Sequence, residues 1–179
     1  MWAVLLLIAV VVVVFVLYNG LVRLRAQADA AWSDIDVQLK RRHDLVPNLV
    51  ETVKGYASHE RDTLQAVVDA RSRAMSARDP GERAQAENAL TGALKSLFAL
   101  AEAYPQLRAA ENFGSLQRSL AEIEDAIQNA RRYFNAVVRD YNTKVQQFPS
   151  NLIARSFGFG ERRYFEMDEG ERAVPGVSF

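Results

Sequence analysis

The two histidines of the chain are not spaced for metal chemistry. His59 begins the sequence HERDT, which starts like a zinc-protease motif but lacks the second histidine four residues later. Di-iron helical bundles need a glutamate three residues before a histidine, and neither His43 nor His59 has one. Cysteine is absent, which excludes thiolate catalysis, thiolate metal sites and disulfides. We therefore expect no metal ligands and no cofactor.

Motifs for covalent catalysis or phosphate binding are missing too. The chain has neither a Gly-x-Ser-x-Gly elbow nor a phosphate-binding Gly-Lys-Ser/Thr loop. Gly158 and Gly160 form an isolated pair, with no helical pattern behind them to receive a phosphate. Lys plus Arg equals Asp plus Glu at 22 each, so no net charge attracts nucleic acid. We expect no catalytic residues, no enzymatic activity and no nucleic-acid partner.

The most informative polar residues are Arg42 and His43, because they interrupt an apolar stripe. The stripe has helical spacing and consists of Ala28, Trp32, Ile35, Leu39, Val46, Leu49 and Val53. A guanidinium in such a stripe can pair with a carboxylate on a facing helix and so set the register of the two helices. The local carboxylates are Asp34, Asp36 and Asp44. We favour this structural role over recognition of a partner or ligand.

Aromatic residues are frequent at the C-terminal end, among glycines and charges. They are Phe157, Phe159, Tyr164, Phe165 and Phe179. A solvated tail does not usually carry five aromatic residues in 23 positions. We expect these residues to pack against their own bundle. The alternative is that the tail docks on a neighbouring subunit as an extended segment.

A membrane anchor must position everything that follows. Residues 2–18 carry no charge, and Leu21 and Val22 extend the apolar run to about 21 positions, or about 30 Å as a helix, the thickness of a bilayer core. Trp2 and Tyr18 bracket the run, where aromatic side chains settle at the membrane interfaces. A cleaved signal peptide fits less well, because no basic segment precedes the run and no cleavage site follows it.

Flanking charges predict the orientation of the anchor. No Lys or Arg precedes the run, whereas Arg23, Arg25 and residues 40–42 follow it. The positive-inside rule then places the N-terminus outside and the bundle in the cytoplasm. Arg23 and Arg25 are close enough to the run to contact anionic headgroups.

The rest of the chain predicts an all-α fold. Its longest helical stripe runs over residues 113–148. The shorter stripes, which we expect in the core, consist of Leu64, Val67, Ala70 and Ala74, and of Ala86, Leu90, Ala93, Leu97, Leu100 and Tyr104. Prolines at 80, 105 and 149 mark breaks between helices. We expect four helices packed antiparallel at shallow angles. Residues 1–22 would be the anchor, 23–156 the helical bundle and 157–179 the aromatic tail.

Four finer expectations concern single residues and one short segment. Pro47 should kink the first helix. We expect Gly55 to separate this helix from the second, and the alternative is one continuous, kinked first-plus-second helix. Residues 150–156 could add a turn or two of helix. Arg131 and Arg132 are expected on a solvated face.

Long collinear blocks of the chain closely resemble the LemA family. The blocks are Tyr18-Asn19, AWSDIDVQLKRRHDLVPNLVETVKGYASHE at 31–60, GERAQAENALTGALKSLFALAEAYPQLRAAENF at 81–113 and YNTKVQQFPSNLIA at 141–154. The resemblance implies one N-terminal membrane helix followed by a helical bundle, in the cytoplasmic (inner) membrane of a bacterium. Ala110 departs from the family pattern, which more often shows Asn there, and this concerns the cap of the last long helix.

The resemblance implies no catalytic residue and no cofactor, and family members associated with membrane organelles favour an organising role. Our first hypothesis is a scaffold that is anchored in the lipid bilayer and self-associates as a homo-oligomer. The alternative is a monomeric adaptor or regulator of another membrane protein, such as a protease or transporter. A ligand sensor with a small molecule near Arg42 and His43 is a third possibility.

Overall fold

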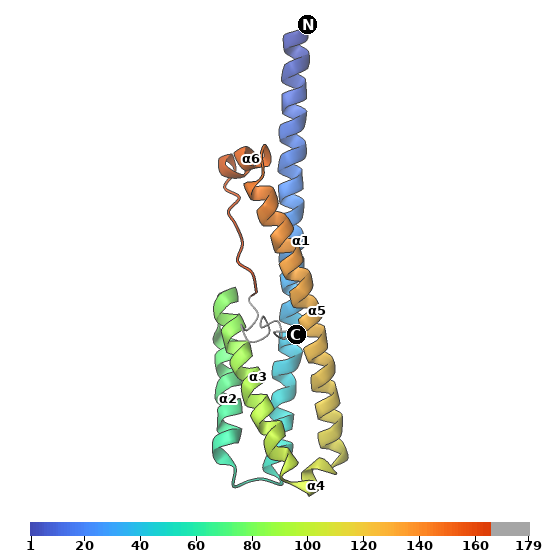
Figure 1. Ribbon diagram of the computed structural model, residues 1–179, viewed down its shortest axis with the longest axis vertical. Helices are drawn as coiled ribbons and strands as arrows, with labels where there is room; N and C mark the ends of the chain where they lie inside the picture. Colours follow the sequence, from blue (N-terminus) through green and yellow to red (C-terminus); the bar gives the residue numbers. More distant parts are fainter. Residues whose placement is uncertain (166–179) are drawn as a thin grey trace, which may run out of the picture. The chain divides into compact units, whose positions relative to one another are not determined.

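The protein, described for residues 1–165 by a computed structural model, is all-α over those residues (Figure 1). Its helices are α1 (Trp2–Lys54), α2 (Arg61–Ser76), α3 (Pro80–Glu102), α4 (Pro105–Arg108), α5 (Glu111–Gln146) and α6 (Ser150–Ser156). The chain divides into two compact units. Residues 1–36 and 129–164 form the anchor unit, and residues 37–128 with Phe165 form the bundle unit. The all-α prediction with one long N-terminal helix is confirmed.

Helix α1 passes through Pro47 without ending and stops at Lys54. Gly55 follows directly, so the first and second helices separate at this glycine, and the alternative of one continuous helix is wrong. The predicted stripe faces inward, with Leu39, Val46 and Leu49 each at most 2% exposed.

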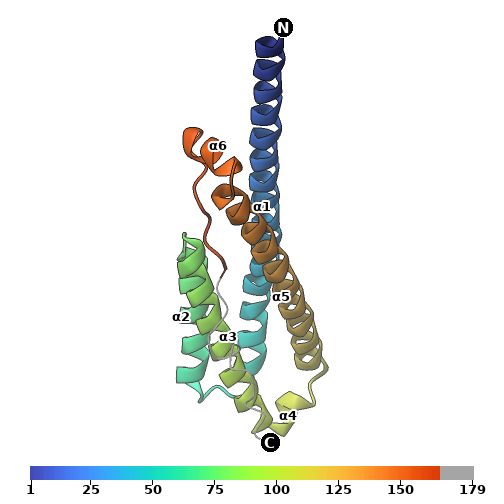
Figure 2. The same ribbon diagram turned by 45° about the horizontal axis from the view of Figure 1, so that its top comes forward.

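Helices α2 and α3 run side by side in the bundle unit (Figures 1 and 2). The connection between them ends in a regular N-cap: Asp79 accepts a hydrogen bond from the backbone nitrogen of Gly81 at 3.1 Å, and Pro80 occupies the first turn. All four stripe residues predicted for α2 are buried, namely Leu64, Val67, Ala70 and Ala74.

The core face of α3 matches the predicted stripe only in part, because Leu90 and Leu97 are shared and the other buried residues are different. Its buried residues are Ala84, Glu87, Leu90, Leu94, Leu97 and Ala101. Ala86 and Ala93, which we assigned to the core, are only half-buried. Alanines occur all around this helix, so spacing alone could not choose between adjacent faces.

Pro105 begins the short helix α4 rather than the last long helix, which starts six residues later at Glu111. Most of the stripe predicted for that helix, α5, is buried, including Leu120, Ile127 and Phe134. Phe148 is an exception, because it lies beyond the end of α5 and is 74% exposed.

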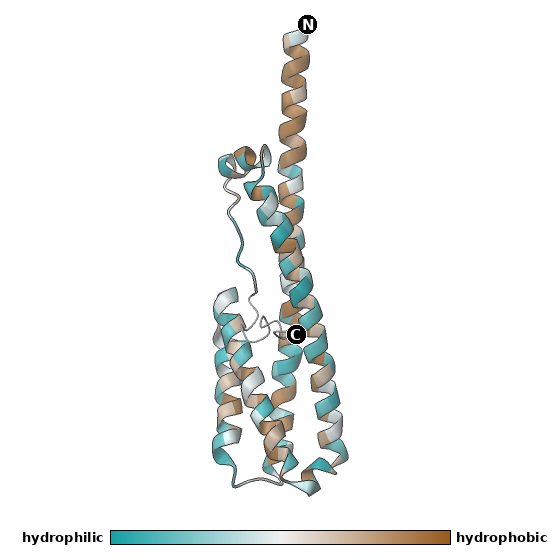
Figure 3. Ribbon diagram, in the orientation of Figure 1, coloured by the Kyte–Doolittle hydropathy of each residue, from teal (hydrophilic) through white to brown (hydrophobic). Residues whose placement is uncertain are grey.

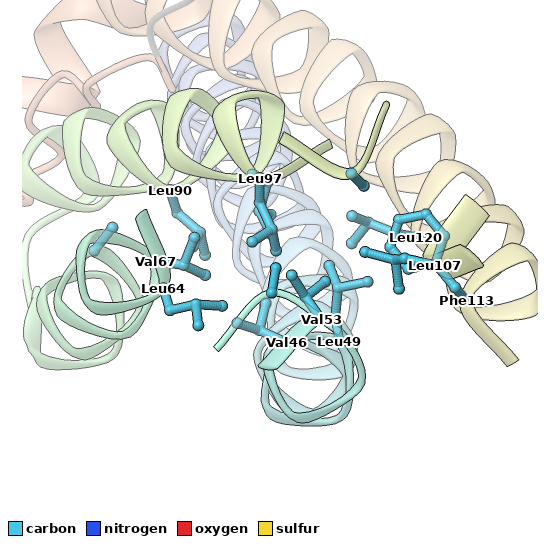
Figure 4. Packing of buried hydrophobic residues seen from close by; sticks show 14 of the residues in the cluster. Val46, Leu49, Val53, Leu64, Val67, Leu90, Leu97, Leu107, Phe113 and Leu120 are labelled. Atoms are coloured by element: carbon cyan, nitrogen blue, oxygen red, sulfur yellow. The ribbon is translucent and has the colours of Figure 1, made fainter. Parts of the chain in front are cut away.

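The core of the bundle unit gathers side chains from α1, α2, α3, α4 and α5 (Figure 4). Val46, Leu49 and Val53 of α1 lie close to Leu97 of α3. Burying one such Leu contributes about 1.5–3 kcal/mol. Phe98 adds a ring contact with Phe113 on α5, with centroids 6.0 Å apart.

A smaller core lies in the anchor unit and includes part of the predicted tail. Phe159 packs with Leu21 of α1, Tyr141 of α5 and Ala154 of α6. The Tyr141 hydroxyl donates to the carbonyl of Gly160 at 3.0 Å, which fixes the segment after α6 on α5. Burial raises the pKa of this phenol above its ordinary value, although two nearby arginines act in the opposite direction. Packing of Phe159 on its own chain agrees with the interpretation we favoured.

The N-terminal part of α1 is long and apolar enough to cross a membrane (Figure 3). Its large side chains are exposed, for example Leu6 at 68% and Phe15 at 68%. The core helix of a soluble protein would bury such a segment, so this exposure indicates a surface made for lipid.

Candidate functional site

Arg42 and His43 lie inside the bundle unit. Their exposed fractions are 2% and 7%, so both side chains are removed from water. Helix α1 presents them between the turns that carry Leu39 and Val46, on the face that packs in the core. A buried cation is tolerable only where an anion and hydrogen bonds compensate it.

Glu87 of α3 provides that compensation. Its Oε1 lies 2.6 Å from Nε2 of His43, and its Oε2 lies 3.5 Å from Nη1 of Arg42. Because a carboxylate oxygen accepts, Nε2 of His43 carries the proton of this hydrogen bond. Glu87 is 4% exposed, so one carboxylate joins two neighbouring α1 residues inside the protein.

Two more side chains complete the contacts of Arg42. Its Nη2 donates to the hydroxyl oxygen of Thr91 at 2.6 Å, and its Nη1 lies 3.4 Å from Oε2 of Glu124 on α5. Thr91 in turn donates to the carbonyl of Glu87 at 3.0 Å. Arg42 therefore pairs with carboxylates on two facing helices, and the local candidates Asp34, Asp36 and Asp44 are not its ion-pair partners.

Pro47 explains a further contact of this site. Proline has no N–H, so the carbonyl of His43, four residues earlier, has no helical donor. Arg71 of α2 supplies the missing donor, because its Nε donates a hydrogen bond to the His43 carbonyl at 2.7 Å. Helix α1 thus continues through a proline where a charged side chain from another helix replaces the missing hydrogen bond.

This network, which we call the Arg42 cluster (Arg42, His43, Arg71, Glu87, Thr91 and Glu124), suits positioning better than reaction. Four helices of the bundle unit contribute to it, and its contacts are satisfied only when all four are in register. The imidazole of His43 is already bonded to Glu87. Within residues 1–165, no group of three His, Cys, Asp or Glu side chains could hold a metal ion.

A cavity of about 240 Å³ lies beside the cluster, between α3 and α5. Its walls are mostly apolar, with Leu94, Phe98 and Leu120 among them, while Lys95 and Glu124 add charges. Arg42 forms part of the lining, and its buried Nε has no hydrogen-bond partner. The cavity is therefore the place in the bundle unit where a small molecule could approach the cluster.

The residues predicted at the membrane interfaces fall in the anchor unit. Trp2 is 86% exposed near the beginning of α1. The Tyr18 ring makes edge contacts with Phe157 and Phe159, at centroid distances of 4.9 and 5.7 Å. Arg23 and Arg25 follow on exposed positions of α1.

The remaining predicted tail residues divide by burial. Phe165 is 1% exposed and Tyr164 is 42% exposed. Phe179 lies outside the described residues. The expectation for Arg131 is wrong, because this side chain is only 8% exposed, whereas Arg132 is exposed as predicted.

Sequence reasoning missed four members of the Arg42 cluster: Arg71, Glu87, Thr91 and Glu124. A signal existed only for Glu87, which stands between Ala84 and Leu90 at core spacing on α3. The signal for Glu87 is weak, because Ala86 and Ala93 favour the neighbouring face of α3 as the core face. Arg71 and Glu124 lie at partly exposed positions of their helices, where charged residues are ordinary.

Known proteins resemble this chain along most of its length. A family model described as "LemA family" matches residues 31–179. The magnetosome protein MamQ of Magnetospirillum gryphiswaldense is 28% identical, over 91% of this chain and 70% of that protein. Magnetosome protein MamQ 2 of Paramagnetospirillum magneticum is 26% identical, over 92% and 70%. Protein LemA of Metamycoplasma hominis is 26% identical, over 86% and 71%.

Proposed function

Because the chain belongs to the LemA family, we propose that it is a membrane-anchored scaffold that self-associates and organises the membrane or its proteins without catalysing a reaction. The bundle unit would lie in the cytoplasm of a bacterium, held on the inner membrane by the N-terminal part of α1. The proposal assigns the protein a structural task and no substrate.

One observation carries the proposal: α1 is an uninterrupted helix of 53 residues with two kinds of surface. Its first part exposes apolar side chains such as Leu6 and Phe15, which suit lipid. Its last part buries Leu49 and Val53 in the core of the bundle unit. A single helix therefore serves both as the membrane anchor and as a core helix of the bundle unit. This double role suits a protein that holds a folded domain on a membrane.

Self-association gains from such an anchor. Chains confined to one membrane meet at a higher effective concentration than chains in solution, so weak contacts suffice for assembly. The names of the MamQ relatives describe them as magnetosome proteins, that is, as components of a cellular structure. An organising role agrees with these names.

The test uses two differently tagged copies of the full chain, expressed together. After gentle detergent extraction from the native membrane, one tag is captured, and the mass and composition of the complex are read by mass spectrometry. The scaffold proposal predicts a complex of several copies that contains both tags. As a control, membranes from cells that carry only one tag each are mixed before extraction, which should yield no mixed complexes.

Two outcomes would contradict self-association. A single copy bound to one different membrane protein in fixed ratio would instead support the adaptor or regulator role. A single copy with no partner would remove both roles and direct attention to the cavity beside Arg42.

A further inference from the structure

An apolar groove separates α6 from the membrane-spanning part of α1. Its volume is about 310 Å³, and both its walls belong to the anchor unit. It is lined by Leu6, Ala9, Val10, Val13, Val14, Leu17, Pro149, Leu152 and Ile153. No polar residue contributes to this lining, so water in the groove would have no hydrogen-bond partner among these side chains.

Next to the groove, α6 and its flanking residues expose large apolar side chains. Phe148 is 74% exposed, Leu152 is 55% exposed and Phe157 is 57% exposed. Three such residues within ten positions are unusual for a surface in water, and they continue the exposed apolar surface of α1. Phe157 touches the anchor itself through Tyr18, with ring centroids 4.9 Å apart.

The position of α6 along α1 matches the edge of a bilayer. The groove places Leu152 and Ile153 beside residues of α1 from Leu6 to Leu17, which all precede Tyr18 and include Val13. If Tyr18 marks the interface, Val13 lies about 7.5 Å deeper along the helix. Interfacial amphipathic helices bury their apolar faces about 5–10 Å below the headgroups, so α6 lies at the depth of such a helix.

The two serine hydroxyls at the ends of α6 are compatible with this position. The Ser150 hydroxyl donates to the carbonyls of Lys144 and Gln147 at 2.6 and 2.8 Å, and that of Ser156 donates to the carbonyl of Leu152 at 2.9 Å. These groups have protein partners and do not require water. Arg155 is exposed and long enough to extend toward headgroup phosphates.

We propose that α6 is a second membrane-contacting element, and that lipid acyl chains fill the groove between α6 and the anchor. Phe148, Leu152 and Phe157 then lie in the interfacial layer of the membrane. The groove is filled by acyl chains, because at that depth acyl chains match its apolar walls and water does not. The inference depends on the membrane anchor of the proposed function but not on self-association.

Spin labels can test this inference in the full chain, because the natural sequence has no cysteine. Leu152→Cys and Phe157→Cys are labelled and reconstituted in vesicles of phosphatidylethanolamine and phosphatidylglycerol. Val13→Cys reports the anchor, and Asp140→Cys, exposed on α5 in the same unit, reports water. Power-saturation EPR compares collisions of each label with oxygen, which partitions into lipid, and with a water-soluble nickel chelate.

The proposal predicts that oxygen relaxes the labels at positions 152 and 157 more than the nickel chelate does. The label at position 13 should behave in the same way. At position 140, the nickel chelate should relax the label more than oxygen does. Lipid-like behaviour at 13 with water-like behaviour at 152 and 157 would overturn the inference and leave the anchor intact. Water-like behaviour at 13 would instead contradict the anchor itself. Labels at 152 and 157 shielded from both reagents would indicate that protein, and not lipid, fills the groove.

Discussion

At the scale of residues, the bundle unit contains buried charges that are compensated by other side chains of the Arg42 cluster. Arg42 is 2% exposed and Glu87 is 4% exposed, so removing either would leave the other buried without one of its ion-pair partners. The full set, in contrast, need not stabilise the protein more than apolar residues of equal size would. We propose that the cluster specifies one register of the four helices, because a shifted register would separate its partners.

Replacing Arg42 by methionine should therefore destabilise the protein by about 3–5 kcal/mol, since Glu87 loses a partner while it stays buried. Chemical denaturation of the full chain in detergent, followed by circular dichroism, measures the loss. The matched control is Arg41→Met, at the exposed neighbouring position, which should change stability by less than about 0.5 kcal/mol. Equal effects of the two variants would show that Arg42 has no special role.

Arg71 offers a second test at this scale. Removing its hydrogen bond to the His43 carbonyl with Arg71→Met should cost about 1.5–3 kcal/mol, the value for a bond with a charged donor. In a Pro47→Ala background the helix supplies its own donor to that carbonyl, so the same substitution should cost clearly less. A double-mutant cycle gives the coupling. Additive effects would mean that Arg71 does not compensate for the proline.

The sequence predicts two of the six residues of this site. Arg42 and His43 stand out because they are polar residues in a stripe of apolar ones. Their partners do not stand out, since α3 carries alanines on neighbouring faces and the choice of face depends on packing against other helices. The donor to the His43 carbonyl is also hidden, because Arg71 is far from Pro47 in the sequence and meets its turn only in the fold.

At the scale of elements, turn chemistry decided which boundaries could be predicted. Gly55 and Pro80 mark true helix ends, and residues 150–156 form a helix as expected. The short helix α4 was not expected, because Pro105 suits the first turn of a long helix as well as that of a short one. Five residues lie between Pro105 and Glu111, the first residue of α5.

The start of α5 supports a prediction about capping. Ala110 directly precedes the helix, and its carbonyl accepts the hydrogen bond from the backbone nitrogen of Gly114 at 3.1 Å. Alanine has no side-chain acceptor for the free N–H groups of the first turn, so Ala110→Asn should stabilise the protein by about 1 kcal/mol. Thermal unfolding should show a Tm higher by about 2–4 °C.

The control for this cap is Ala121→Asn, at an exposed position within α5. Asparagine has a lower helix propensity than alanine in a helix interior, so this variant should lower the Tm. A decrease in Tm for both variants would show that residue 110 is not the cap of α5.

At the scale of the whole molecule, the open question is which side of the membrane holds the bundle unit. The proposed topology predicts that a cysteine inserted between Met1 and Trp2 reacts with an impermeant maleimide in intact spheroplasts. Ala99→Cys, exposed on α3, should react only after the membrane is permeabilised, because the basic residues after the anchor favour the cytoplasmic side. The reverse pattern would establish the opposite orientation.

The proline inside α1 also has a consequence for how the sequence can change over time. While Pro47 is present, the His43 carbonyl depends on Arg71 for its hydrogen bond. A lineage that loses this arginine before the proline therefore has a His43 carbonyl without a donor. A lineage that loses the proline first regains the helical donor and frees residue 71 to vary. Among relatives, substitutions at position 71 should therefore accompany or follow the loss of the proline at position 47. The order of change at these two distant positions would then reflect the single hydrogen bond from Arg71 to the His43 carbonyl.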